Sequence, residues 1–278
     1  MMSKAKKIAV LLVAGAAGIL GAHQASASVV FAYTFPTLNA GPLNTVSATT
    51  GTGTAIQLGM TNSYTYANGE GPGSSAACDI VNTAGSSITE NTWRIRGNSN
   101  AKNAGPGNAN GWNNSAPNYT QGAEFGGDTT GFTPTLLTFD WFSTNQGVAN
   151  LQVRYTTDGT NFTNLGSDFI ATPNDFVAES VSLASLPAGA ANDPNFGIEL
   201  VSVRPLLGDA NYQAAGPGGD GNYASATAAT GAAGDYNNNS GNWRFDNVTV
   251  NGTAIPEPAS SSVLGLAGLA LLGRRRQK

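Results

Sequence analysis

Carboxylates are the only general acid and base side chains that this chain carries in quantity, because seventeen of its 278 residues are Asp or Glu and one is His. Two carboxyl groups held about 5 to 10 Å apart can hydrolyse a glycosidic bond, one as the acid and the other as the base or nucleophile. Spacing along the chain pairs none of the candidates, so only folding could bring two of them together. The candidates on predicted strands are Glu124, Asp140, Glu179, Glu199 and Asp246.

Aromatic side chains offer a second chemistry, the stacking of a ring on the apolar face of a sugar. Trp93, Trp141 and Trp243 lie in strand-like runs, where packing in the core is the expected role. Trp112 lies in a Gly/Asn-rich stretch without strand periodicity, and Tyr119 follows it closely. We expect Trp112 and Tyr119 to be surface contacts to a glycan, and capping of one end of the core is the alternative for Trp112. The remaining stacking candidates are Tyr155, Tyr212, Tyr223 and Tyr236.

Histidine and cysteine chemistry is nearly absent. The single histidine, His23, lies in an N-terminal segment that we expect to be removed, and the single cysteine, Cys78, cannot form an internal disulfide. The usual Ser-His-Asp triad and imidazole-based zinc sites therefore do not fit the mature chain. We predict no catalytic residues, no cofactor and no metal site, with an oxygen-ligated structural calcium ion as the alternative. The oxygen ligands considered for calcium are Glu70, Asp79, Asp220 and Asp246, which lack the D-x-D-x-D spacing.

The charge of the central part of the chain limits its partners. Residues 28–255 carry six basic and sixteen acidic side chains, a net charge of −10. Nucleic acids and anionic lipids both require a basic face, so neither is expected as a partner. The balance is typical of an exported protein that contacts neutral glycans or divalent cations.

Strand periodicity dominates this central part. Apolar and polar residues alternate at Leu151, Val153 and Tyr155, and an Asp-Gly pair at Asp158 and Gly159 predicts a hairpin with a tight turn. We predict an all-β fold, a single jelly-roll-like β-sandwich over residues 28–253. The strand-like runs are residues 28–35, 54–60, 92–97, 121–126, 135–143, 149–157, 161–170, 176–183, 196–204 and 242–252.

Three polar stretches interrupt these strands. Residues 66–87, 97–118 and 208–242 are rich in Gly, Asn, Ala and Ser and cannot build a core. We expect long surface loops rather than linkers, because strands resume after each stretch without a change in composition. Local disorder is expected in the third stretch, which is nearly devoid of branched aliphatic residues.

The first 27 residues have the layout of a secretory signal peptide. A basic start, "MMSKAKK", precedes an apolar core over residues 8–22 and the small-residue site Ala25-Ser26-Ala27. We expect export through the Sec machinery and cleavage by signal peptidase after Ala27. An uncleaved membrane anchor is the alternative, although the apolar run is short for a span of about 20 residues.

The last residues, 254–278, form a second sorting segment with three parts. These parts are the triplet Pro256-Glu257-Pro258, the small and apolar run 259–273, and the basic cluster Arg274, Arg275 and Arg276. Fifteen residues span about 22 Å as a helix, less than the roughly 30 Å of a bilayer core. The arginines favour the cytoplasmic side, which leaves the triplet outside with the exported domain.

This tail resembles the PEP-CTERM sorting signal of Gram-negative bacteria in the order and placement of all three parts. The resemblance implies that an exosortase recognises the triplet and removes the tail after a transient insertion of its hydrophobic, transmembrane-type helix in the inner membrane. A permanent C-terminal membrane anchor is the alternative.

The resemblance further implies delivery to the cell surface or extracellular matrix and an association with exopolysaccharide and biofilm. We therefore expect an exported, non-catalytic surface or matrix protein. The alternative is a carbohydrate-binding module, or an ice-binding or adhesin-like protein, and the third hypothesis is a carboxylate-dependent glycoside hydrolase.

Overall fold

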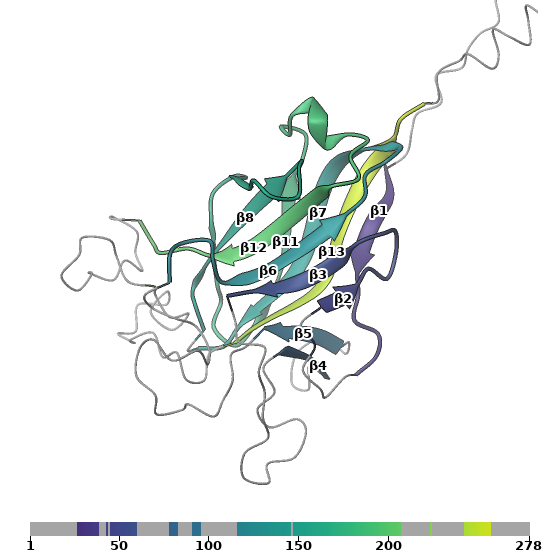
Figure 1. Ribbon diagram of the computed structural model, residues 1–278. Helices are drawn as coiled ribbons and strands as arrows, with labels where there is room; N and C mark the ends of the chain where they lie inside the picture. The colour runs from purple at the N-terminus through teal and green to yellow at the C-terminus, as the bar shows by residue number, and fades with distance from the viewer. Residues whose placement is uncertain are drawn as a thin grey trace, which may run out of the picture.

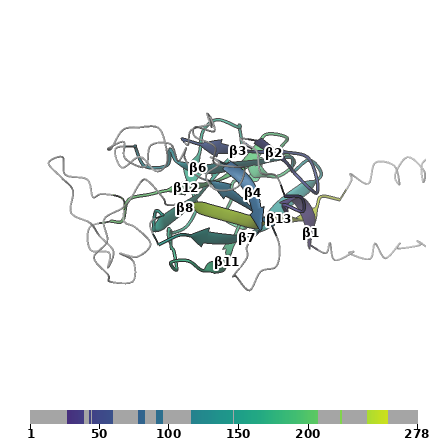
Figure 2. The same cartoon turned by 90° about the horizontal axis from the view of Figure 1, so that it is seen from below.

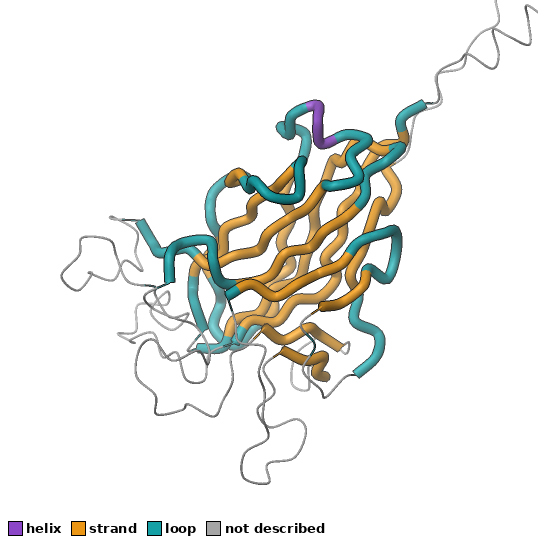
Figure 3. Tube along the Cα trace, in the orientation of Figure 1, coloured by secondary structure: helices purple, strands orange, loops and turns teal. Residues whose placement is uncertain are grey.

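The computed structural model describes residues 27–38, 43, 45–59, 78–82, 91–95, 116–145, 147–206, 223 and 242–256. These residues form two antiparallel sheets that pack face to face (Figures 1 and 2), which confirms the predicted all-β sandwich. One short 3-10 helix, η2 (Ala188–Ala190), lies at one end of the sandwich (Figure 3). In the part of the chain that the structure describes, no helix is long and apolar enough to cross a membrane.

The first sheet, sheet A, has six strands and its long strand β13 runs through the middle. The first part of β13 pairs with β5, and the last part pairs with β1. The strand order is β11 (Phe176–Ser182), β7 (Phe132–Ser143), β13 (Trp243–Ala254), β5 (Asn91–Ile95) and β4 (Cys78–Asn82), with β1 (Ala27–Tyr33) paired to β13.

The second sheet, sheet B, has seven strands, and β6 and β12 lie at its centre. Figure 2 shows β3, β6 and β12 in the layer opposite β7 and β11. The strand order is β10 (Phe169–Ile170), β8 (Asn150–Thr156), β12 (Phe196–Ser202), β6 (Gly122–Gly127), β3 (Thr54–Leu58) and β2 (Thr45–Ser47), with β9 (Thr163–Asn164) paired to β8.

All ten strand-like runs of the sequence contain strands, with small shifts at their ends. The run 161–170 divides into the two short strands β9 and β10. The interpretation of residues 66–87 as a surface loop is wrong for Cys78–Asn82, which forms β4. These residues form a strand because they pair with β5 and bury Ile80, a contact that no local pattern predicts.

The hairpin predicted at Asp158 and Gly159 is confirmed, but its turn is longer than the tight turn that we expected. Tyr155 pairs with Thr163, so a longer loop joins β8 to β9. Asp158 closes this loop on itself, because its Oδ1 accepts hydrogen bonds from the backbone N–H of Thr160 at 2.9 Å and Asn161 at 2.7 Å. Such side-chain to backbone bonds give the N–H groups of the loop hydrogen-bond partners without strand pairing.

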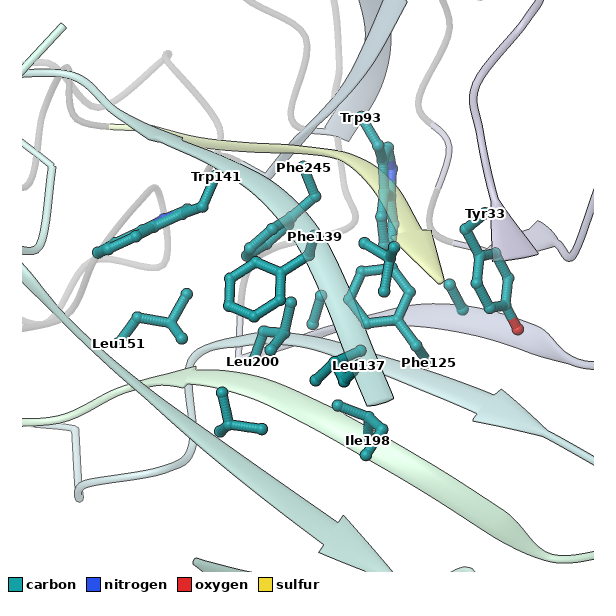
Figure 4. Close-up of a cluster of buried hydrophobic side chains, with 14 of the residues drawn as sticks. Tyr33, Trp93, Phe125, Leu137, Phe139, Trp141, Leu151, Ile198, Leu200 and Phe245 are labelled. Carbon is teal, nitrogen blue, oxygen red and sulfur yellow. The ribbon is translucent and has the colours of Figure 1, made fainter. Parts of the chain in front are cut away.

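The core between the sheets combines aliphatic side chains with many aromatic ones (Figure 4). The ring of Phe125, on β6, lies edge-on to Tyr33 at 5.3 Å, to Phe245 at 5.8 Å and to Trp93 at 6.0 Å between ring centroids. Such edge-to-face contacts add to the stabilisation from burial. The predicted core role of the three strand tryptophans is confirmed, since Trp93, Trp141 and Trp243 are all buried.

A β-bulge in β13 marks the point where the partner of the strand changes. Asp246 pairs with Asp140 and Thr249 pairs with Thr138, so β13 contains one extra residue there. Asn247 takes a left-handed conformation with φ 51°, which suits Asn better than most residues, and its Nδ2 donates to Asp140 Oδ2 at 2.8 Å. The bulge shifts the last part of β13 into register with β1.

Candidate functional site

The outer face of sheet B carries charged side chains where its three central strands meet. Glu199 on β12 lies directly opposite both Glu124 on β6 and Arg154 on β8. Side chains alternate along a strand, and the neighbours Phe125 and Ile198 enter the core, so these charged groups point away from it. The fold therefore brings together two of the five carboxylates considered from the sequence.

Arg154 binds Glu199 and holds the adjoining hairpin. Its Nη1 donates to Glu199 Oε2 at 2.6 Å, its Nη2 to the carbonyl oxygen of Phe162 at 2.6 Å, and its Nε to Asn164 Oδ1 at 3.1 Å. The guanidinium carbon also lies 4.8 Å from the ring centre of Tyr119, a cation–π contact. Because all three guanidinium nitrogens donate to the protein, Arg154 acts as a fixed internal counter-charge to Glu199.

Burial raises the pKa of both carboxyl groups in this pair. Burial raises the pKa of Glu199 from 4.5 to about 7, and the negative charge of Glu124 acts in the same direction, while Arg154 opposes both. Burial also raises the pKa of Glu124. Glu199 is only 6% exposed, so desolvation of its charged form is the dominant effect.

A pocket of about 320 Å³ opens beside this pair, and we call it the glycine groove. Gly126 and Gly197 lie opposite each other on β6 and β12 and leave the backbone bare between them. A Cβ atom on Gly197 would lie 3.1 Å from the Thr156 methyl group, and one on Gly126 would lie 3.3 Å from a backbone oxygen. Both distances are tighter than usual Cβ contacts, so the two positions suit glycine better than a residue with a side chain. The described residues that line the groove are Thr52, Gly53, Thr54, Glu124, Gly126, Gly127, Asp128, Thr156, Gly159, Pro194, Asn195, Phe196 and Gly197.

The other three carboxylates lie away from the groove. Asp140 and Asp246 are opposite each other in sheet A, where Asn247 donates to Asp140. Glu179 lies on β11 opposite the core residue Phe139, and burial raises the pKa of its carboxyl group. The five candidates thus divide between two sheets, and only Glu124 is a lining residue of the groove.

The aromatic residues considered for sugar stacking differ in how exposed they are. Tyr119 is partly exposed, holds φ 69°, and its hydroxyl oxygen accepts a hydrogen bond from Asn164 Nδ2 at 3.0 Å. The stacking role considered for Tyr223 is wrong, because that side chain is fully buried and its hydroxyl donates to the backbone oxygen of Pro117 at 2.9 Å. Tyr155 packs partly buried against the core, so it is also unsuited to stacking. Trp112, Tyr212 and Tyr236 lie outside the described residues.

The oxygen ligands considered for calcium are not gathered in the described part of the chain. Asp246 is only 1% exposed, on strand β13. Asp79 lies on β4 opposite Arg94, whereas Glu70 and Asp220 fall outside the described residues. Among the residues that the structure describes, no group of three or more His, Cys, Asp or Glu side chains could hold a metal ion.

The two predicted processing sites meet the fold at the same end. Ala27 is the first residue of β1, and it pairs with Thr253 near the end of β13. Pro256 follows β13 closely and is exposed. Outside the described residues lie Ala25, Glu257, Pro258, the apolar run 259–273 and the cluster Arg274, Arg275 and Arg276.

Arg154 and the groove glycines were not anticipated as site residues from the sequence. The signal that could have identified Gly126 and Gly197 is a glycine inside a strand pattern, which often marks a place where a ligand or another backbone approaches closely. No comparable signal exists for Arg154, whose role depends on which residue lies opposite it.

No family model matches this chain, and no curated protein matches it either. Among solved structures, one described as "CBM4 structure and function" is 10% identical, covers 71% of this chain and 94% of its own, and has a TM-score of 0.30. The N-terminal cellulose-binding domain of β-1,4-glucanase C from Cellulomonas fimi is also 10% identical, covers 73% and 90%, and has a TM-score of 0.29. Similarity this low assigns neither a relationship nor a ligand.

Proposed function

We propose that this chain is an exported, non-catalytic protein that binds a glycan on the outer face of sheet B. The observation that carries this proposal is the glycine groove, a recess floored by bare backbone at Gly126 and Gly197. A flat floor without side chains can accept a sugar ring lying on the sheet. The exposed hydroxyl group of Thr54 and the exposed amide group of Asn195 lie at the groove, where they can bond sugar hydroxyls.

The carboxyl pair beside the groove favours binding over hydrolysis. Glycosidases need two carboxyl groups that both reach the substrate. Glu199 is buried and held by Arg154 at 2.6 Å, so of the pair only Glu124 faces the groove. The other carboxylate that lines the groove, Asp128, lies in a turn, where its Oδ1 accepts a hydrogen bond from the backbone N–H of Thr130 at 2.8 Å. We therefore place the glycoside hydrolase hypothesis behind the binding one.

Export and surface delivery are the second part of the proposal. The layout of residues 1–27 supports cleavage after Ala27, and the tail supports recognition of Pro256, Glu257 and Pro258 by an exosortase. Exposure of Pro256 just after β13 is consistent with access by a processing enzyme. In this proposal the protein reaches the cell surface or matrix and contacts exopolysaccharide there.

A polysaccharide pull-down with the full chain tests the binding proposal. Thr54 is exposed on β3 at the side of the groove, so Thr54→Trp should block the groove without disturbing the core. Ala178→Trp is the matched control, because Ala178 is exposed on an outer strand of sheet A. We expect the wild type and A178W to be retained on the producer's own matrix and T54W to be lost. Equal retention of T54W and A178W, or no retention of any form, would overturn the proposal.

A further inference from the structure

The glycine groove carries an uncompensated negative charge. The ion pair between Arg154 and Glu199 neutralises one of the two central carboxylates. Glu124 accepts no hydrogen bond from any residue that the structure describes, and it lines the groove together with Asp128. No lysine or arginine occurs among the described lining residues. A ligand in this groove therefore meets two carboxylates and no cation.

Glu124 is partly buried, so its negative charge interacts more strongly with a bound ligand than a fully exposed charge would. Burial raises the pKa of its carboxyl group, which means that the charged form is poorly solvated when the groove is empty. A cationic group on a ligand would replace the missing solvation, and the attraction between two such charges is stronger in a partly desolvated site than in water. The same charges repel anionic glycans such as those with uronic acid or sulfate groups.

The arrangement fits an ammonium group better than a metal ion. A divalent cation with oxygen ligands needs about six or more of them. The described residues contain no cluster of three carboxylates, and Asp128 Oδ1 already accepts a hydrogen bond from the backbone N–H of Thr130 at 2.8 Å. A single ammonium needs only one or two acceptors, which Glu124 can supply.

The place of the groove on the sheet favours a sugar over an extended peptide. A peptide commonly binds a sheet by adding a strand at an edge. The groove lies instead on the face of central strands, since β6 pairs with both β3 and β12 along the floor. Backbone groups there are already used, while the side chains of Thr54 and Asn195 are exposed at the edge of the groove.

We infer that the groove selects a glycan with free amino groups, and that Glu124 is the specificity residue that pairs with the sugar ammonium. The inference rests on the proposed glycan-binding function and adds the class of sugar. It concerns hexosamine units that are not acetylated, because acetylation removes the charge and adds bulk.

Two oligosaccharides that differ only in acetylation test this inference. The full chain is titrated calorimetrically, at about pH 6.5 and low salt, with the β-1,4-linked hexamer of glucosamine and with that of N-acetylglucosamine. We expect at least about tenfold tighter binding of the glucosamine hexamer, which corresponds to about 1.4 kcal/mol. Glu124→Gln should lower the affinity for the glucosamine hexamer at least about tenfold and so remove this preference. Asp140→Gln is the control, since it removes a carboxylate from the other sheet.

The possible outcomes separate this inference from the proposed function. Equal affinity for the two hexamers, or a preference that survives E124Q, would overturn the amino-sugar inference. If matrix retention still depends on Thr54 in that case, the binding proposal stands. A hexalysine peptide that binds as tightly as the glucosamine hexamer, with the same dependence on Glu124, would reassign the groove to a basic peptide and also overturn the inference.

Discussion

Arg154 forms a 2.6 Å ion pair with Glu199, while Glu124, which lies directly opposite Glu199 on the neighbouring strand, has no such partner among the described residues. Two like charges on facing positions of a sheet destabilise each other. The arrangement therefore combines one neutralised and one uncompensated carboxylate on a partly buried surface.

Stability should fall as pH rises through the titration of Glu199. Its pKa is about 7 in the folded state against 4.5 ordinarily, so the folded protein binds more protons than the unfolded chain between these values. The contribution of Glu199 is thus most favourable below about pH 4.5 and is lost as pH rises to about 7. Relative to Glu199→Gln, the wild type should lose up to about 3 kcal/mol between these limits. Urea unfolding of both proteins at several pH values measures the difference, and parallel curves would contradict the prediction.

Replacing Arg154 should lower the stability of the fold, because the buried carboxylate of Glu199 then lacks its cation. Arg154→Met leaves Glu199 without its cation, and breaking such a pair by removing one partner destabilises by about 3 kcal/mol. Without Arg154 the pKa of Glu199 should rise further above about 7, so the loss should be small at pH 5, where the carboxyl group is protonated, and reach its full size only at about pH 9. The double variant R154M/E199Q is the control, and chemical unfolding should show that it recovers much of the lost stability. A double variant no more stable than R154M would argue against this explanation.

The bulge in β13 should tolerate glycine better than alanine. Asn247→Ala must hold the left-handed conformation without an amide and should lose about 1 to 3 kcal/mol. Asn247→Gly keeps the backbone freedom and loses only the side-chain bonds to Asp140 at 2.8 Å and Asp246 at 3.4 Å, so its loss should be smaller. Thermal unfolding of the two variants under the same conditions measures this order, and the reverse order would show that the backbone conformation is not the limiting factor.

The aromatic core should depend strongly on the ring that joins the two sheets. Phe125→Ala removes the contacts to Tyr33, Trp93 and Phe245 and should cost about 4 kcal/mol. Leu136→Ala is the control, because Leu136 is 38% exposed and should cost well under half as much. The urea midpoints of the two variants and the wild type, compared at a constant m-value, give the two losses of stability. Similar losses of stability for the two variants would contradict a dominant contribution from the buried ring of Phe125.

Processing of the tail is tested by mass spectrometry of the protein recovered from the cell surface. We expect residues 259–278 to be absent, because the short apolar run is a poor permanent anchor and Pro256, the first residue of the triplet, is exposed. A signal peptide cut after Ala27 should appear in the same spectra as a new N-terminus at Ser28. Recovery of surface protein that still carries Arg274, Arg275 and Arg276 would refute removal of the tail.

Local sequence determined most of the fold. The alternation of apolar and polar residues along β8 and β12 and the apolar run in β7 predicted strands. These patterns are visible in one segment at a time, because they depend only on which of its side chains are buried. The buried role of Trp93, Trp141 and Trp243 followed from the same patterns. The short strand β4 did not, because its pattern is brief and its stability comes from pairing with β5.

The site depended on relationships that no single segment contains. The sequence by itself determined that Glu124, Arg154 and Glu199 lie on strands, together with the layout of the two sorting segments. Only the tertiary structure decided that these three side chains are neighbours on one face and that Gly126 faces Gly197. The physical reason is register: a shift of one residue in any pairing would turn every side chain of that strand to the other face, and packing of the common core fixes the pairing.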